Sequence, residues 1–412
     1  MTTFWMTNVR LEKGFIYKNE RIVGTETEIC HLKIDEGRIT EITYTAPDSA
    51  EYHFDAHGQL LLPSLRDMHI HIDKTYYGGT WKACTPITKG IFTRLEEEKE
   101  LLPKLLPTAQ ERAEKMIELY LRNGHTHIRT HCNVDPVIGL KNLEATVNAL
   151  QKYEDVLTYE IVAFPQHGLL LSDSVQLIRD AMKNGATLVG GVDPATVERN
   201  IEKSLHTIFD IAVEYNKGVD IHLHDPNTLG AFTFERMAHY TKEAGLKGRA
   251  TISHGIALGD LQGDALTEMA AILKDQEIDV TTTVPVNRAT IPIPTLDKLG
   301  ISVSTGHDSI TDHWSPFGTG NTIQKLGVLA ERFRMIDEYS LASALKYATG
   351  GVTPLNEKGE RVWPKVGDEA TMMLVNASCS AEAIARRASV DALFFKGKKV
   401  ESKLTETKTV EV

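Results

Sequence analysis

Short apolar segments alternate with amphipathic stretches through the middle of the chain. The stretches at residues 109–124, 171–185 and 195–218 place apolar residues at i, i+3 and i+4, which is typical of helices packed on a core, and several end at glycine. The apolar segments have the length and β-branched content of buried strands, and eight can be counted: 68–73, 126–134, 159–165, 187–192, 219–224, 250–254, 279–284 and 301–307.

Eight strand and helix repeats over about 250 residues predict an α/β fold, specifically a closed (β/α)8 TIM barrel. An open doubly wound sheet is the alternative. It is disfavoured because no complete G-x-G-x-x-G follows a first strand, and Gly318-Thr-Gly320 lacks the third glycine.

The two ends of the chain alternate with a period near two, which indicates β-strands. Hairpin turns are expected at Asp35-Glu36-Gly37 and at Lys396-Gly397. We predict that residues 1–62 and 360–412 form one small composite β-sandwich domain beside a barrel domain at 63–359. Two unrelated β extensions are the alternative.

Composition and charge exclude several classes of partner. An apolar fraction of 42% and a charged fraction of 25% are typical of a globular protein. Forty-five basic and fifty-six acidic residues give a net charge of −11, which repels nucleic acids and anionic membranes. The start of the chain does not read as a leader, and no apolar run approaches the roughly 18 residues of a membrane span. Four widely spaced cysteines suit a reducing cytoplasm, where we expect the protein.

Histidines collect where the predicted strands end, which is where barrel active sites form. His69 and His71 are two residues apart and therefore share one side of the first strand. His222, His254 and the pair His307-Asp308 end later strands. A lone histidine is usually a core residue, but this ordered set favours a site of imidazole nitrogens and a carboxylate, which suits zinc or ferrous iron.

These residues, together with several neighbouring motifs, resemble the cytosine deaminase branch of the amidohydrolase superfamily. The motifs are Arg129-Thr-His131, Ile161 to Gln166, Ser253-His254, Gly306-His307-Asp308 and Asp312-His-Trp314. Within that branch, Leu188 to Thr196 and Asp220 to Asp225 resemble the isopropylammelide aminohydrolases, which remove an alkylamine from a hydroxylated triazine. The resemblance covers nearly the whole chain and implies a homo-oligomer.

The resemblance implies that His69, His71, His222 and Asp308 are the metal ligands and that His254 orients or deprotonates the attacking water. Superfamily members with two metals usually carry a bridging lysine at the end of strand four. Residues 187–193 contain no lysine, so we expect one divalent ion, zinc in the first place and iron as the alternative.

A proton must also reach a ring nitrogen of the substrate. Cytosine deaminases use a glutamate three residues after the strand-five histidine, where this chain has the shorter Asp225. His224, on the same face as His222, is the other candidate, and the sequence leaves the choice between Asp225 and His224 open.

Four further residues are predicted to contact substrate, each with a structural alternative. Lys74 could bind a ring oxygen or form a salt bridge in the barrel mouth, and Gln166 could bind an amide-like ring edge or cap a loop. Trp314 could cover the ring or belong to the core, and Asp193 could face substrate or cap the next helix.

Two other features are expected to be structural. Cys132 is interpreted as a small buried residue behind the site. The run Glu96-Glu97-Glu98-Lys99-Glu100 is interpreted as a solvated helix face.

The resulting hypothesis is a metal-dependent aminohydrolase that releases ammonia or a small alkylamine from a hydroxylated or keto N-heterocycle, pyrimidine-like or triazine-like. A cyclic amide hydrolase of the same superfamily is the enzymatic alternative. A catalytically silent metal-binding barrel is the third hypothesis.

Overall fold

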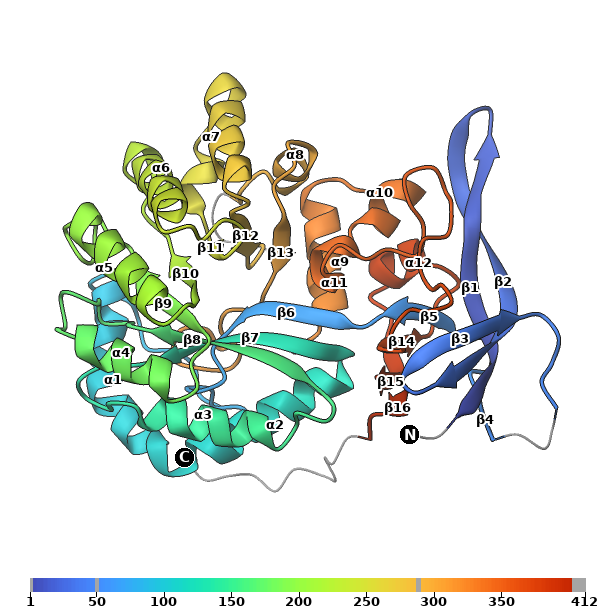
Figure 1. Ribbon diagram of the computed structural model, residues 1–412, viewed down its shortest axis with the longest axis horizontal. Helices are drawn as coiled ribbons and strands as arrows, with labels where there is room; N and C mark the ends of the chain where they lie inside the picture. The colour runs from blue at the N-terminus through green and yellow to red at the C-terminus, as the bar shows by residue number, and fades with distance from the viewer. Residues whose placement is uncertain (1–2, 49–51, 287–289, 402–412) are drawn as a thin grey trace.

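The computed structural model describes residues 3–48, 52–286 and 290–401, which form two sheets (Figure 1). One sheet is parallel and is surrounded by helices, while the other is built from the two ends of the chain. The proposed domain limits, 1–62 with 360–412 and 63–359, stay a prediction, and residues 402–412 lie outside the described part of the chain.

The parallel sheet follows the order of the sequence and confirms the predicted barrel. Two backbone hydrogen bonds close it, from His71 N to Asp308 O at 2.9 Å and from Asp308 N to His69 O at 2.6 Å. Its strands are β6 (Leu65–Ile70), β7 (His125–Asn133), β8 (Thr158–Phe164), β9 (Leu188–Val192), β10 (Gly218–His222), β11 (Ala250–Ser253), β12 (Asp279–Thr282) and β13 (Val303–Thr305).

Helices between the strands cover the outside of this sheet (Figure 1). The α-helices of the described residues are α1 (Ile91–Leu105), α2 (Ala109–Arg122), α3 (Lys141–Gln151), α4 (Val175–Lys183), α5 (Ile201–Glu214), α6 (Asn227–Glu243), α7 (Gly263–Asp275), α8 (Ile293–Lys298), α9 (Thr322–Arg332), α10 (Glu338–Ser343), α11 (Lys346–Thr349) and α12 (Ser380–Ala385). Of these, α10 and α12 pack on each other, and α1 borders the barrel mouth. Helix α5 begins later than the predicted start at residue 195, because Asn200 caps it by accepting a hydrogen bond from Lys203 N.

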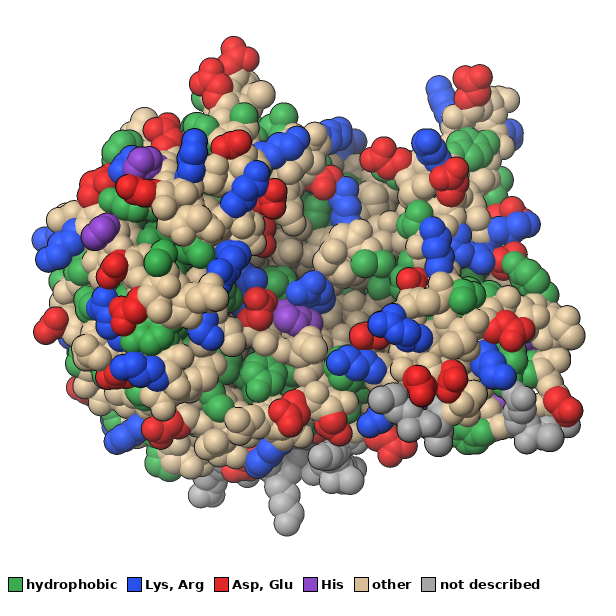
Figure 2. Space-filling model, viewed as in Figure 1, with side chains coloured by type: hydrophobic (Ala, Val, Ile, Leu, Met, Phe, Trp, Pro, Cys, Tyr) green, Lys and Arg blue, Asp and Glu red, His purple; other side chains and the backbone are tan. Residues whose placement is uncertain are grey.

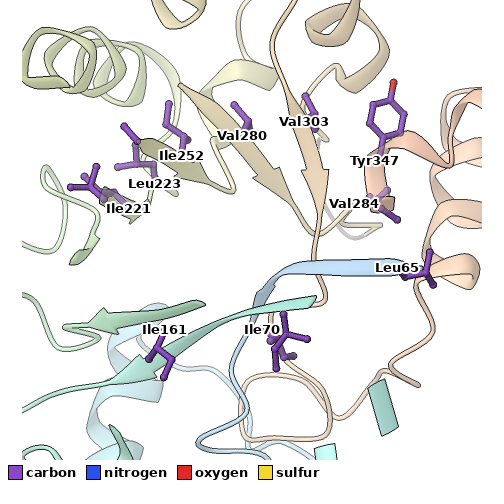
Figure 3. Close-up of a cluster of buried hydrophobic side chains, with 14 of the residues drawn as sticks. Leu65, Ile70, Ile161, Ile221, Leu223, Ile252, Val280, Val284, Val303 and Tyr347 are labelled. Carbon is purple, nitrogen blue, oxygen red and sulfur yellow. The ribbon is translucent and has the colours of Figure 1, made fainter. Parts of the chain in front are cut away.

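Side chains along the barrel strands point alternately to two opposite faces, so apolar core residues and polar site residues lie on different faces. In β10 and the residue after it, Ile221 and Leu223 belong to the buried apolar cluster, whereas His222 lies between them on the opposite face. Figure 3 shows apolar side chains from successive strands, including Ile252 and Val280, in the same cluster. The apolar residues therefore pack the barrel while the alternate positions carry polar groups.

The second sheet confirms that the chain ends meet. Its order is β16-β15-β14-β5-β1-β2-β3, β4 pairs with β1, and β14 pairs antiparallel with β5. The strands are β1 (Phe4–Lys18), β2 (Arg21–Asp35), β3 (Arg38–Thr43), β4 (His53–Asp55), β5 (Leu60–Pro63), β14 (Met372–Val375), β15 (Val390–Phe395) and β16 (Lys398–Lys399). Both predicted hairpin turns are present, with positive φ at Glu36, Gly37, Lys396 and Gly397.

None of the helices in the described ranges combines the length and the apolar character that a membrane-spanning segment needs. On the face shown in Figure 2, basic and acidic side chains are interspersed.

His125, at the start of β7, makes the fold sensitive to acid. The ring is fully buried, with Nδ1 3.1 Å from Tyr120 O and Nε2 2.7 Å from Thr322 Oγ1, and burial lowers its pKa to about 3. The unfolded chain takes up this proton near pH 6.5, so stability falls by about 1.4 kcal/mol per pH unit below that value. Between pH 7 and pH 5, we expect His125→Gln to lose about 2 kcal/mol less unfolding free energy than the wild type in urea titrations. Equal losses would contradict the assignment.

Candidate active site

The four predicted metal ligands converge at the C-terminal mouth of the barrel. His69 lies near the end of β6 and His71 directly follows it, His222 ends β10, and Asp308 follows β13. Each offers one ligand atom, and these four atoms all lie within 4.8 Å of one another. The structure therefore brings together residues that are up to 239 positions apart in the sequence.

The donor atoms of this cluster fit a divalent metal. Asp308 Oδ1 lies 3.4 Å from His69 Nε2 and 3.3 Å from His71 Nε2. Both ring nitrogens of His222 are buried and have no hydrogen-bond partner among the described residues. Unpaired buried nitrogens are costly, and coordination of a metal satisfies them. Three imidazoles and one carboxylate suit zinc or iron.

The protonation states also match those of metal ligands. Burial lowers the pKa of His71 to about 3, assisted by the charge of Lys74, and burial holds the pKa of His222 well below its usual range. Burial alone would raise the pKa of Asp308, but the neighbouring rings of His69 and His71, 3.4 and 3.3 Å away, hold it well below its ordinary value. Neutral imidazoles and a charged carboxylate are the forms that bind metals.

A hydrogen-bonded chain below the cluster orients His69. Its Nδ1 lies 2.8 Å from Ser253 Oγ, and Ser253 donates to Asp220 Oδ1 at 2.6 Å. Asp220 Oδ2 accepts from Arg129 at 2.9 Å. Such partners fix the ring of a metal ligand and tune its affinity. Our sequence reasoning did not assign these roles, although Asp220 precedes His222 by two residues and so shares its face.

His254 lies beside the cluster but does not belong to it. Its ring centroid is 4.8 Å from that of His69 and 4.2 Å from that of His224. His254 and Asp308 have φ of 68° and 66°, a region that residues other than glycine seldom occupy. Strain of this kind is often found at active sites. The predicted action of His254 on water, rather than as a ligand, stays a prediction that this position supports.

His224 forms a pair with Asp193 at the edge of the same cavity. Its Nδ1 lies 2.9 Å from Asp193 Oδ2, while Asp193 Oδ1 accepts from the backbone N–H groups of His224 and Asp225 at 2.5 and 3.2 Å. Both oxygens of Asp193 are therefore engaged in orienting its neighbours. Asp193 does not cap α5, because Asn200 is the N-cap residue of that helix. The carboxylate of Asp193 instead bonds to His224 and to the backbone of Asp225.

Asp225, the other candidate for proton transfer, is also present at the cavity. It is buried, with Oδ2 accepting from Ala195 N at 3.2 Å and Oδ1 unpaired among the described residues. Burial raises the pKa of Asp225, and the neighbouring charge of Asp193 raises it further. The structure thus brings both alternatives, His224 and Asp225, to one wall.

One cavity of about 480 Å³ collects the predicted site. It is lined by the three ligands His71, His222 and Asp308 and by every predicted catalytic and substrate residue: His224, Asp225, His254, Lys74, Gln166, Asp193 and Trp314. Ile87, Ile91 and Arg94, from α1 and the segment before it, form part of the wall. Cys132 is fully buried and lies outside the cluster of the four candidate ligands.

Glu98 corrects the interpretation of residues 96–100 as a solvated face. Its side chain is fully buried, and its carboxylate accepts five hydrogen bonds. Oε1 accepts three of them, from Lys74 Nζ (3.3 Å), His313 Nε2 (2.8 Å) and Trp314 Nε1 (2.9 Å). Oε2 accepts the other two, from His167 Nε2 (3.1 Å) and Asn133 Nδ2 (3.1 Å). Burial would raise the pKa of Glu98, but the charge of Lys74 and these hydrogen bonds hold it well below its usual range.

The Glu98 network explains the arrangement of the substrate residues. Lys74 forms the salt bridge that was its structural alternative, and it also donates to Gln166 Oε1 at 3.0 Å. Its Nζ lies 5.5 Å from the centroid of the Trp314 ring. Glu98 therefore holds Lys74 and Trp314 directly, and Gln166 through Lys74.

Replacing Glu98 with Gln is expected to lower the unfolding free energy by about 3–5 kcal/mol, because it removes the carboxylate that forms the ion pair with the buried ammonium of Lys74. Urea titration of the variant checks this. Glu100→Gln is the matched control, since Glu100 is exposed in the same helix and its loss should change stability by less than about 0.5 kcal/mol. Similar stabilities of the two variants would contradict a structural role for Glu98.

Three histidines and an aspartate gathered at a barrel mouth, with further histidines facing one cavity, form a candidate metal site of the kind found in metal-dependent hydrolases. The chain belongs to the amidohydrolase family, whose pattern matches residues 141–400. It is 31% identical to N-isopropylammelide isopropyl amidohydrolase of Pseudomonas sp. (strain ADP) over 82% of this chain and 85% of that protein. It is 45% identical to the uncharacterised protein YahJ of Escherichia coli (strain K12) over 96% of this chain and 87% of the other.

Solved structures show the same relationship. N-isopropylammelide isopropylaminohydrolase from Burkholderia multivorans superposes with a TM-score of 0.84 at 26% identity, covering 97% of this chain and 98% of that one. The fold is shared with 5-methylcytosine deaminase from Klebsiella pneumoniae, with a TM-score of 0.77 at 24% identity over 99% and 100% of the two chains. The resemblance to the amidohydrolase superfamily, near the isopropylammelide enzymes, is confirmed, and the protein is a hydrolase of carbon–nitrogen bonds other than peptide bonds.

Proposed function

We propose that the protein is a metal-dependent aminohydrolase that releases ammonia or a small alkylamine from a hydroxylated or keto N-heterocycle of the pyrimidine or triazine type. One observation carries this proposal: the candidate metal ligands and the pair formed by His224 and Asp193 line the same cavity. The names of the amidohydrolase relatives support a heterocyclic substrate.

A first group of residues binds the metal ion and acts on the attacking water. His69, His71, His222 and Asp308 would hold one divalent ion, zinc or iron, which activates a water as nucleophile when bound. His254 hydrogen-bonds that water, and Asp308 accepts its proton and passes it to the leaving nitrogen.

The ring is bound and protonated by a second group of residues. Gln166 and Lys74 present polar atoms to the ring edge, and Trp314 covers its face. His224, oriented by Asp193, delivers a proton to a ring nitrogen, so that negative charge does not build on the heterocycle. Asp225 is the alternative donor.

A substrate screen tests the proposal. Pyrimidines, triazines and pterins are offered to protein loaded separately with zinc, iron and manganese, and the products are analysed for ammonia, alkylamine and ring-opened acid. Release of an amine with retention of the ring is expected. A ring-opened product would instead support the cyclic amide hydrolase, and bound metal without turnover of any ring would support the silent barrel.

Cytoplasmic location and homo-oligomerisation belong to the same proposal. The four cysteines are unpaired, a state that a reducing compartment preserves. Sedimentation of the purified protein measures the oligomeric state, and a monomer at micromolar concentration would contradict the second part.

A further inference from the structure

A second cavity of about 530 Å³ adjoins the catalytic one. Asp308, Ser309 and Trp314 line both cavities, so the two share a border that includes a predicted metal ligand. The walls of the second cavity come from the loop after β12, from residues 314–319 and from the start of α9. None of the proposed catalytic steps uses this space.

Lys325, in the first turns of α9, supplies a charge to the second cavity. Its Nζ donates to Thr283 O at 2.8 Å, and no carboxylate in the described part of the chain lies within ion-pair distance of it. Burial lowers the pKa of this ammonium group, and the more distant charges of Asp67 and Asp308 offset part of that effect. A partly buried cation with one neutral acceptor is a group that an anion would stabilise.

Two neighbouring features also favour an anion. The N-terminus of α9 faces the cavity through Asn321 and Gln324, and helix N-termini favour negative charge. Val284, which follows the carbonyl that Lys325 binds, has φ of 51°, a strained conformation for a β-branched residue. Such strain is typical of functional sites, and here it lies in the cavity wall.

The position of the cavity indicates which part of a substrate would reach it. In the proposed reaction the leaving nitrogen receives its proton from Asp308, so a substituent on that nitrogen starts where the two cavities meet. We propose that the second cavity binds a carboxylate carried by the leaving amine, with Lys325 as its counter-ion. This inference rests on the proposed function and narrows it to rings that bear a carboxyalkylamino group.

The reaction balances without any further reactant. The hydroxyl of water forms a bond to the ring carbon, the bond between that carbon and the exocyclic nitrogen breaks, and the nitrogen leaves with the remaining proton of the water. The products are a hydroxylated ring and an amino acid. Lys325 holds the carboxylate and takes no part in bond breaking.

Binding to metal-free protein tests the inference without turnover. The probes are two hydroxylated triazines, one with a carboxypropylamino group and one with a pentylamino group of similar length. Calorimetry is expected to show that the wild type binds the acid at least about tenfold more tightly, as a charge-assisted contact permits. Lys325→Met should remove this preference and leave the affinity for the pentylamino ring unchanged.

The control is Lys358→Met, which removes the same charge at an exposed position outside both cavities and should keep the preference. Equal affinities of the wild type for the two rings would overturn the inference. A loss of both affinities in Lys325→Met would also overturn it, because Lys325 would then only support the loop at Thr283. Failure of the proposed function is a separate result, namely no release of amine from any ring by the metal-loaded enzyme.

Discussion

Protein with His222 replaced by Asn is expected to purify without metal and without measurable turnover. His222 contributes one of four converging ligands, and both its ring nitrogens are buried without another partner among the described residues. His69→Ala and Asp308→Ala should behave in the same way. The wild type should carry about one metal per chain, since residues 187–193 offer no bridging lysine. Elemental analysis of the purified variants measures this.

Two further variants distinguish residues that bind the metal directly from residues that lie next to the metal ligands. Ser253→Ala should weaken metal affinity by about 10-fold to 100-fold without abolishing binding, because Ser253 only orients His69. His254→Asn should retain metal and lose most turnover. Loss of metal from the His254 variant would mean that His254 is a ligand, and two tightly held ions per chain would contradict the mononuclear site.

The second large effect is expected at His224. His224→Asn should keep the metal and lower turnover by about 10²-fold or more, the usual scale for a lost general acid or base. Asp193→Asn is the matched variant, because it leaves the imidazole in place but removes the carboxylate that orients it. Asp193→Asn should show part of the loss of turnover seen in His224→Asn. It should also change the dependence of turnover on pH, which a purely structural defect would not do. Steady-state kinetics on the substrate found by the screen measure both.

Asp225→Asn decides between the two candidate donors. If His224 transfers the proton, this variant should lose less activity than His224→Asn. An inactive Asp225 variant beside a nearly normal His224 variant would reverse the assignment. The raised pKa of Asp225 makes that reversal chemically reasonable, since a protonated carboxyl group can donate.

The barrel and its ligands could be predicted because they depend on periodic features of the sequence. Period-two alternation placed His69 beside His71, and the end of each apolar segment marked the mouth of the barrel. The full length of β1 is harder to predict. Irregularities in its pairing with β2 interrupt the alternation of the sequence without ending the strand.

Glu98 and Lys325 could not be assigned in this way. Glu98 stands in a run of charged residues that reads as a solvated face, and the partners that bury it come from separate loops around the barrel mouth. Lys325 lies on an amphipathic helix, and only the loop at Thr283 shows that it faces a cavity. Contacts between distant loops leave no local pattern.

The pairing of β5 with β14 also constrains how the protein is made. Leu61 lies opposite Leu374, so the ribosome must add about 300 residues between the two strands before the sheet can be completed. At about 5–20 residues per second, the apolar edge of β5 waits on the order of 15–60 seconds for its partner. A nascent chain in this interval exposes strand edges prone to aggregation. A supply of chaperones during synthesis should therefore raise the yield of folded protein.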